Sequence, residues 1–205
     1  MSGGARADVL ARIRAALGPG AEAPEVPRRY RGARIDDSSV DRFCERVAEY
    51  KASVTRVRAA ELPETVARLC AGRRIAVPPG GPDAVDGVEV VVDDPPLSPA
   101  ALDKLDGVLT GCALAIAETG TIVLDGGERS GRRALTLVPD WHICIVEAGA
   151  IVAGVPDAIA LLREAADDGR PITFVSGPSA TSDIELDRVE GVHGPRRLDV
   201  VVVSA

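Results

Sequence analysis

At 205 residues, the chain is long enough for one domain with an extension and for a substantial buried core. Its net charge of −7 disfavours a general role on nucleic-acid phosphates or on anionic membranes. Hydrophobic residues make up 46% and charged residues 27%, as in soluble globular proteins, but aromatic residues only 2%. So few aromatics argue against base-stacking recognition of single-stranded nucleic acid, and they leave a core built from Ala, Val, Leu and Ile.

The first 35 residues predict a helix followed by an extended arm. Apolar Leu10, Ile13 and Leu17 recur at helical spacing between arginines, which indicates a short amphipathic helix over Arg6–Leu17. A proline- and arginine-rich segment follows that cannot bury much surface. We interpret residues 1–35 as a helix and a basic arm, which is either a solvated tail or a docking arm for an acidic partner or a sister subunit.

No targeting or membrane segment is evident in the sequence. The opening residues have no apolar stretch of signal-peptide length, and nowhere do about 18 apolar residues run together, as a transmembrane helix requires. We therefore expect a cytoplasmic protein without membrane insertion.

Residues 36–205 predict one α/β domain. The expected helices carry apolar residues at helical spacing or a capping residue: one with an inner face of Val40, Phe43, Cys44 and Val47, then Leu62–Cys70, a helix capped by Ser98 through Leu105, and one from Pro156 through Ala166. The expected strands are short β-rich runs: Val54–Val57, Ile75–Val77, Val88–Val92, two runs within Gly107–Leu124, Ala134–Val138, Ile143–Val146, Ile172–Val175 and Asp199–Val203. Helices alternate with strands early and strands cluster in the middle, which favours a domain with a mixed sheet.

The stretch 171–195 carries the strongest signal of a site. A buried strand over Ile172–Val175 is expected, and small hydroxyls, a glycine and a carboxylate follow it, at the place where open α/β sheets bind ligands. The predicted substrate-binding residues here are Ser176, Gly177, Ser179, Thr181 and Asp183. Their backbone N–H and hydroxyl groups suit a carboxylate or a phosphate. The alternative is a capped turn, in which Ser182 and Glu185 form a capping box.

A second candidate is Glu118, at the junction of two apolar runs and followed by Thr119 and Thr121. A carboxylate held at the end of buried strands can act as a general base or a nucleophile, since desolvation raises its pKa. The alternative is a hairpin-turn glutamate in water.

The histidines and cysteines give no clear metal pattern. His142 and Cys144 share a face if their segment is a strand, and together with His193 they offer three potential ligands, but no acidic residue supports such a site. His193, between two glycines, fits better as a catalytic group or one that holds a carboxylate. The cysteines form no closely spaced pair, so we expect no zinc or iron–sulfur site and mostly buried, reduced thiols. They are Cys44, Cys70, Cys112 and Cys144.

Taken together, four ordered motifs resemble the LUD-domain family, and most closely its small lactate utilization proteins that lack iron–sulfur motifs. The motifs are Ala117-Glu118-Thr119-Gly120-Thr121, Pro139-x-x-His142, the run from Ser176 to Glu185, and Gly191-Val192-His193-Gly194-Pro195. One departure is Ala180, where the family's motif carries an arginine, so any contact of that arginine with an anionic substrate is missing here.

The resemblance implies a fold like that of the ribose-5-phosphate isomerase, glucosamine-phosphate deaminase and CoA-transferase superfamily. It also implies a part in oxidising L-lactate to pyruvate beside iron–sulfur partner proteins, with a small carboxylate as substrate and no cofactor on this chain. We accordingly predict an accessory or substrate-handling subunit with Glu118, His142 and His193 as catalytic residues. The alternative is an acyl- or CoA-transferase-like enzyme in which Glu118 is the nucleophile.

Overall fold

The chain divides into two compact units, residues 1–31 and residues 32–205. The structure, a computed structural model, describes residues 3–19, 25–26, 39–81, 87–178 and 194–204. In the first unit, one helix, α1, spans Gly3–Leu17. Most of the basic arm lies outside the described residues, so its predicted extent to residue 35 and its role stay predictions.

The prediction that the first helix is amphipathic is wrong, although the helix itself is confirmed. At 3.6 residues per turn, Arg6 and Arg14 lie on the same side of α1 as Leu10, Ile13 and Leu17. Apolar and cationic side chains therefore share one side of the helix, and α1 has almost no separate apolar face. Among the described helices, none is both long and apolar enough to cross a membrane.

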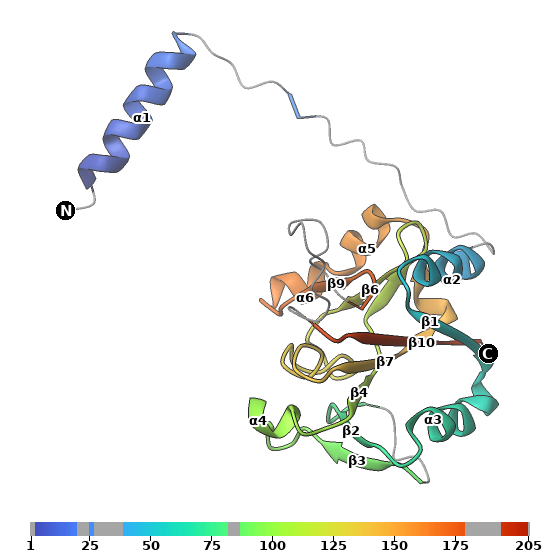
Figure 1. Ribbon diagram of the computed structural model, residues 1–205. Helices are drawn as coiled ribbons and strands as arrows, with labels where there is room; N and C mark the ends of the chain where they lie inside the picture. Colours follow the sequence, from blue (N-terminus) through green and yellow to red (C-terminus); the bar gives the residue numbers. More distant parts are fainter. Residues whose placement is uncertain (1–2, 20–24, 27–38, 82–86, 179–193, 205) are drawn as a thin grey trace. The chain divides into compact units, whose positions relative to one another are not determined.

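The second unit is built on a six-stranded, fully parallel sheet (Figure 1). In spatial order its strands are β1 (Ser53–Arg58), β10 (Arg197–Ser204), β7 (Trp141–Glu147), β4 (Gly107–Thr110), β2 (Arg74–Val77) and β3 (Glu89–Val92). The central pair is in register from Arg197 beside Trp141 to Val203 beside Glu147. Both faces of this sheet are covered, which is why its inner strands read as unbroken apolar runs.

A smaller four-stranded sheet mixes strand directions. Its order is β8 (Ile151–Val152), β5 (Leu114–Ile116), β6 (Thr121–Leu124) and β9 (Thr173–Val175). Strands β5 and β6 form an antiparallel hairpin, β9 pairs antiparallel with β6, and β8 pairs parallel with β5. The predicted mixed-sheet α/β class is therefore confirmed, while the likeness to the ribose-5-phosphate isomerase and CoA-transferase superfamily stays a prediction.

Helices cover the outer faces and fill the space between the two sheets. They are α2 (Ser39–Glu49), η1 (Ala59–Glu61), α3 (Leu62–Cys70), α4 (Pro99–Leu102), η2 (Ala148–Ala150), α5 (Val155–Leu161) and α6 (Arg163–Asp167). Helix α3 packs on one face of the large sheet, and α2 with the small sheet packs on the other. Helix α5 covers the far face of the small sheet.

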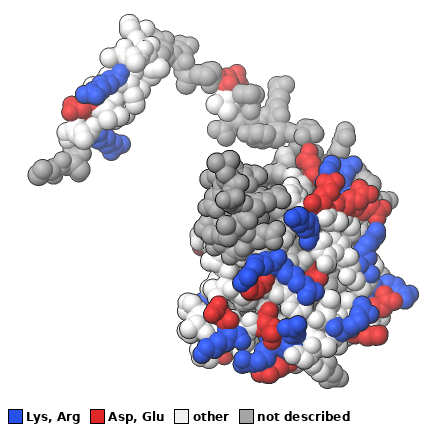
Figure 2. All heavy atoms as spheres, in the orientation of Figure 1, with Lys and Arg blue, Asp and Glu red and all other residues white. Residues whose placement is uncertain are grey.

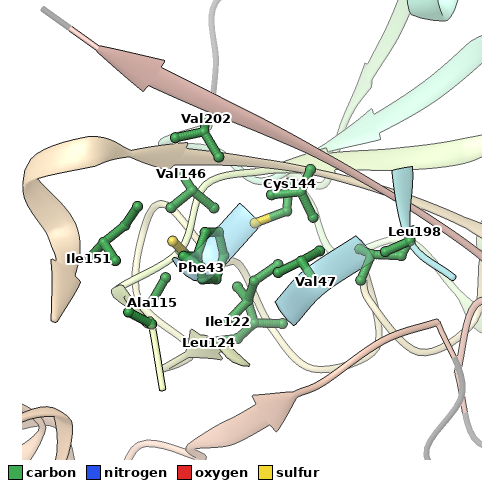
Figure 3. Close-up of a cluster of buried hydrophobic side chains, with 14 residues drawn as sticks. Phe43, Val47, Ala115, Ile122, Leu124, Cys144, Val146, Ile151, Leu198 and Val202 are labelled. Carbon is green, nitrogen blue, oxygen red and sulfur yellow. The ribbon is translucent and has the colours of Figure 1, made fainter. Parts of the chain in front are cut away.

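Helix α2 places its apolar side chains between the two sheets (Figure 3). Phe43 and Val47 are almost completely buried and meet Cys144 and Val146 of the large sheet and Ile122 of the small sheet. The inner face predicted for this helix is therefore confirmed. Alternate residues of β7 point to the opposite face, where they pack with α3.

Three predicted elements are wrong in type or extent. Ala134–Val138 is a series of turns rather than a strand, because the N–H of Leu135 bonds the carbonyl of Arg132 and that of Val138 bonds the carbonyl of Ala134. The helix after Pro156 is interrupted at Leu162, whose backbone leaves the helical region. The helix after Ser98 is capped as expected, since the Ser98 hydroxyl accepts from the Ala101 N–H at 3.2 Å, but it ends at Leu102.

Two further differences bear on the site. The apolar run after Gly107 is not one strand but two, β4 and β5, which belong to different sheets. The strand expected over Ile172–Val175 exists as β9, but it is not buried: it is a sheet edge, and Phe174 is 44% exposed. It is also antiparallel to its neighbour, so the rule for ligand binding at the ends of parallel strands does not apply to it.

Acidic and basic side chains alternate over the visible face of the second unit, without a large patch of one sign (Figure 2). Many charged side chains of this unit pair, as Arg73 does with Asp106 and Arg74 with Glu89. This part of the surface offers no extended basic track of the kind that binds a phosphate backbone.

The turn between β5 and β6 tests the contact between α2 and the small sheet. Gly120 has a φ of +60°, and a Cβ there would lie 2.6 Å from the Cβ of Arg46 and 2.8 Å from the N of Val47. Gly120→Ala should lower the free energy of unfolding by about 2–4 kcal/mol, because both the backbone and α2 would have to shift. Urea unfolding followed by the fluorescence of Trp141, the only tryptophan, measures this.

Gly149→Ala is the matched control, because a Cβ at Gly149 meets no atom within 4 Å. This control should change the unfolding free energy by less than about 1 kcal/mol. Equal effects of the two substitutions would contradict the close packing of the turn on α2.

Candidate functional site

The structure brings together three of the predicted substrate-binding residues in a chain of hydroxyls. The Oγ1 atoms of Thr119 and Thr121 are 2.7 Å apart, and the Oγ1 of Thr121 is 2.7 Å from the Oγ of Ser176. Because Ile122 of β6 pairs with Val175 of β9, the antiparallel ladder carries Ser176 to the position opposite Thr121. Two segments that are far apart in the sequence thus form one polar group, which we call the hydroxyl cluster.

Gly177, the fourth predicted residue, follows Ser176 of the hydroxyl cluster and packs against Tyr50, directly after the end of α2. Its φ is +100°, and a Cβ there would lie 2.8 Å from the Cβ of Tyr50. Only glycine adopts this backbone without strain while its chain lies so close to Tyr50. The backbone at Gly177 is therefore closely packed against Tyr50.

Glu118 is exposed in the turn before the hydroxyl cluster. Its N–H donates to the Ala153 carbonyl at 3.0 Å, which ties the turn to the segment before α5. Its carboxylate lies beside the backbone of Gly154, where a Cβ would be 3.1 Å from the Oε2 atom. The predicted roles of Glu118 as base or nucleophile stay predictions.

His142 lies on the other sheet and is only 1% exposed. Its Nε2 is hydrogen-bonded to the Oγ1 of Thr110 at 2.9 Å. Burial, with a smaller contribution from the nearby charge of Arg133, lowers the pKa of His142 to about 4, so the ring is neutral at neutral pH. A neutral, fully enclosed ring bonded to Thr110 has no exposed surface to present to a substrate in this conformation, and its catalytic role stays a prediction.

The remaining predicted residues lie outside the described part of the chain. They are Ser179, Thr181, Asp183 and His193, together with Ala180. The capping box predicted at Ser182 and Glu185 lies there as well.

The cysteines are spread over different elements of the core. Cys144 and Cys112 are buried on the α2 face of the large sheet, and Cys70 is buried on the α3 face. The hydrogen bond with Cys112, followed by burial, raises the pKa of Cys144, and burial raises the pKa of Cys70 to about 11. The thiols of Cys70 and Cys144 are therefore protonated at neutral pH, whereas metals bind the thiolate form. Within the described residues, no group of three metal-binding side chains converges.

A second location, at the carboxyl edge of the large sheet, is missed by the sequence analysis. From β2 the chain moves to β3 on one side and then returns to β4 on the other, so strand order reverses between β2 and β4. At such a switch point, open α/β sheets bind ligands. A cavity of about 190 Å³ lies here, which we call the switch-point pocket. Its lining residues are Leu62, Gly80, Gly81, Gly111, Arg129, Ile145 and Glu147.

The sequence does carry a signal for this pocket. Two glycines, Gly80 and Gly81, follow the run that forms β2, and Gly111 follows the run that forms β4. Glycines directly after parallel strands allow the backbone to approach a ligand closely. Without the strand order, however, nothing shows that these two loops are neighbours.

Comparison with known proteins agrees with the family resemblance of the motifs around the hydroxyl cluster. The LUD domain profile matches residues 100–203. The chain is 53% identical over 165 residues to Lactate utilization protein C of Deinococcus radiodurans, covering 79% of this chain and 78% of that protein. The chain belongs to the LUD-domain family. A crystal structure of a DUF162 family protein from the same organism matches with a TM-score of 0.72 and 45% identity, over 81% of this chain and 96% of that one.

More distant LUD relatives match a shorter stretch. Lactate utilization protein C of Bacillus subtilis is 35% identical over 100 residues, which is 47% of this chain and 41% of that protein. Lactate utilization protein C of Bacillus licheniformis is 37% identical over a stretch of the same length and also 41% of its own chain. The aligned stretch thus covers less than half the length of each of these two relatives. The family match at residues 100–203 includes both the hydroxyl cluster and the charged residues of the switch-point pocket.

The buried His142 makes the stability of the protein dependent on pH. Between about pH 6.5 and pH 4 the unfolded chain protonates this histidine and the folded chain does not, so the free energy of unfolding falls as the pH falls through this window. From pH 7 to pH 5 this loss should be on the order of 2 kcal/mol. Urea unfolding of the wild type and of His142→Gln at pH 7 and pH 5 measures the part of this loss that comes from His142.

The chain has only two histidines, so His193→Gln is a matched control. The wild type and H193Q should lose similar stability on acidification, and H142Q clearly less. An equal loss in all three proteins would contradict a buried, neutral His142.

Proposed function

We propose that this LUD-domain protein serves lactate utilization as a substrate-handling subunit of a cytoplasmic, iron–sulfur-dependent system that oxidises L-lactate to pyruvate. The observation that carries the proposal is the 53% identity, over 79% of the chain, to a protein named Lactate utilization protein C. Identity at this level over most of the chain supports a shared fold and a shared set of surface and site residues.

The cysteines of this chain do not fit a cluster of its own. An iron–sulfur cluster is held by thiolates that converge on one point. Here Cys70 lies on one face of the large sheet and Cys112 and Cys144 on the other, and burial keeps Cys70 and Cys144 protonated. This arrangement supports the proposal that partner proteins carry the iron–sulfur clusters of the system.

The polar groups of the chain suit the handling of a small carboxylate. The hydroxyl cluster has three O–H groups but only two internal hydrogen bonds, so one hydroxyl hydrogen is left for another acceptor. The switch-point pocket adds a guanidinium and a carboxylate. Both places can orient an acid substrate, while electron transfer is left to the partners.

Isolation of the tagged chain from lactate-grown cells of its native host tests this function. The chain should co-purify with brown iron–sulfur proteins, and the complex should reduce a dye with L-lactate. The chain alone should show no lactate-dependent dye reduction, because no cluster ligands converge within the part of the chain that the structure describes. Cells grown without lactate provide the control for nonspecific capture.

Two outcomes would contradict the proposal. Robust lactate oxidation by the isolated chain, free of metal and flavin, would overturn the accessory role. Unimpaired growth on L-lactate after deletion of the gene, with no related gene present, would overturn the role in lactate utilization.

A further inference from the structure

The switch-point pocket is open because glycines line it. A Cβ at Gly80 would lie 2.7 Å from the Cβ of Glu128, and a Cβ at Gly111 would lie 3.1 Å from the Nε of Arg129. The backbone of Gly111 also donates its N–H to the Arg129 carbonyl at 2.9 Å, which holds the loop after β6 against the end of β4. Side chains at these glycines would push into the loop that carries Arg129.

The pocket contains one charge of each sign. The NH2 of Arg129 lies 3.5 Å from the Oε1 of Glu147, and both side chains are about half exposed (51% and 46%). This separation exceeds the 2.7–3.2 Å typical of N–H···O hydrogen bonds, so the two groups attract each other without a strong bond. The planar guanidinium has five N–H donors, enough to bind a second carboxylate while Glu147 stays nearby.

The rest of the lining limits the ligand to a small molecule with an apolar end. Leu62, at the start of α3, and Ile145, in β7, supply aliphatic surface. A volume of about 190 Å³ lies below the roughly 300–1,000 Å³ of pockets for drug-sized ligands, so a nucleotide is too large for it. Glu147 would repel the additional negative charge of a dicarboxylate or a phosphate dianion.

We propose that the switch-point pocket binds a small 2-hydroxy monocarboxylate, with its carboxylate on Arg129, its hydroxyl donating to Glu147, and its alkyl end against Leu62 and Ile145. The choice of L-lactate as the probe rests on the function proposed above. A 2-hydroxy acid offers a hydrogen-bond acceptor and a donor on adjacent carbons, which matches a guanidinium and a carboxylate 3.5 Å apart.

Three ligands that differ by one group test the pocket on the unmodified full chain. L-Lactate has both polar groups, propionate lacks the hydroxyl, and lactamide lacks the carboxylate charge. Calorimetric titration should show L-lactate binding about tenfold more tightly than either analogue, because propionate makes no hydrogen bond to Glu147 and lactamide brings no carboxylate to Arg129. NMR titration should shift the backbone amide signals of Gly80, Gly81 and Gly111.

Two variants assign the contacts. Arg129→Gln should weaken L-lactate binding about tenfold and remove the preference over lactamide, and Glu147→Gln should remove the preference over propionate. Arg163→Gln, in an arginine that is 85% exposed on α6, is the matched control and should bind as the wild type. Circular dichroism checks that each variant is folded.

A negative result for the pocket can be told apart from a negative result for the proposed function. Signal shifts confined to Thr119, Thr121 and Ser176 would place lactate at the hydroxyl cluster and overturn the pocket, while the role in lactate utilization would stand. Equal binding of all three ligands, or no binding of L-lactate at millimolar concentration, would also overturn the pocket. Loss of the co-purification described above would leave the titrations unaffected and count only against the subunit role.

Discussion

The packing of Phe43 and Val47 between the two sheets is the contact on which the rest of this domain depends. A six-stranded parallel sheet needs both faces covered, and on this face the cover consists of α2 and the small sheet together. With aromatic residues at only 2%, the core has few large side chains, and Phe43 is the one phenylalanine that is fully buried, since Phe174 lies at a sheet edge. Burying such a side chain contributes about 1.5–3 kcal/mol. The same contact presses α2 against the turn at Gly120 and so fixes the strand that carries Thr121.

The spacing of apolar residues along the chain predicts the elements that are buried on one side only. The inner face of α2 and the bounds of α3 follow from apolar spacing, because a helix with one buried side must repeat every 3.6 residues. The spacing of apolar residues does not reveal the structure where nearly all successive residues are buried. The residues from Gly107 to Ala117 are almost all buried, so the sequence gives no sign that the chain passes from one sheet to the other after Thr110. At Ala134–Val138, Leu135 is fully buried by a turn, which an apolar run cannot distinguish from a strand.

The site was predictable in its residue types but not in its assembly. Thr119, Thr121 and Ser176 stand out as small hydroxyls beside strands, yet their contact requires the pairing of β6 with β9, about fifty residues later in the chain. The strand before Ser176 was expected to be buried because Ile172–Val175 is apolar. Its true place at an antiparallel edge depends on partners that the local sequence does not reveal. The switch-point pocket, likewise, exists only because β4 returns to the far side of β2.

Charge decides which of the two polar places can hold an acid. The protein carries a net charge of −7, so a carboxylate approaches against the overall field and needs a local cation. Three arginines lie between β6 and β7, and two of them are engaged. Arg132 binds Asp93 through two hydrogen bonds of 2.6 and 2.9 Å, and Arg133 donates to Thr136 while burial lowers its pKa. Arg129 lines the switch-point pocket and is paired only loosely with Glu147.

The hydroxyl cluster, by contrast, is neutral, and two of its three hydroxyl hydrogens are already used internally. A neutral donor can orient a bound acid but contributes little to attracting one through an opposing field, because its field falls off faster with distance than that of a full charge. The guanidinium of Arg129 therefore accounts for anion binding better than the hydroxyl cluster does. Of the two described polar places, the switch-point pocket is the one whose charge favours a carboxylate.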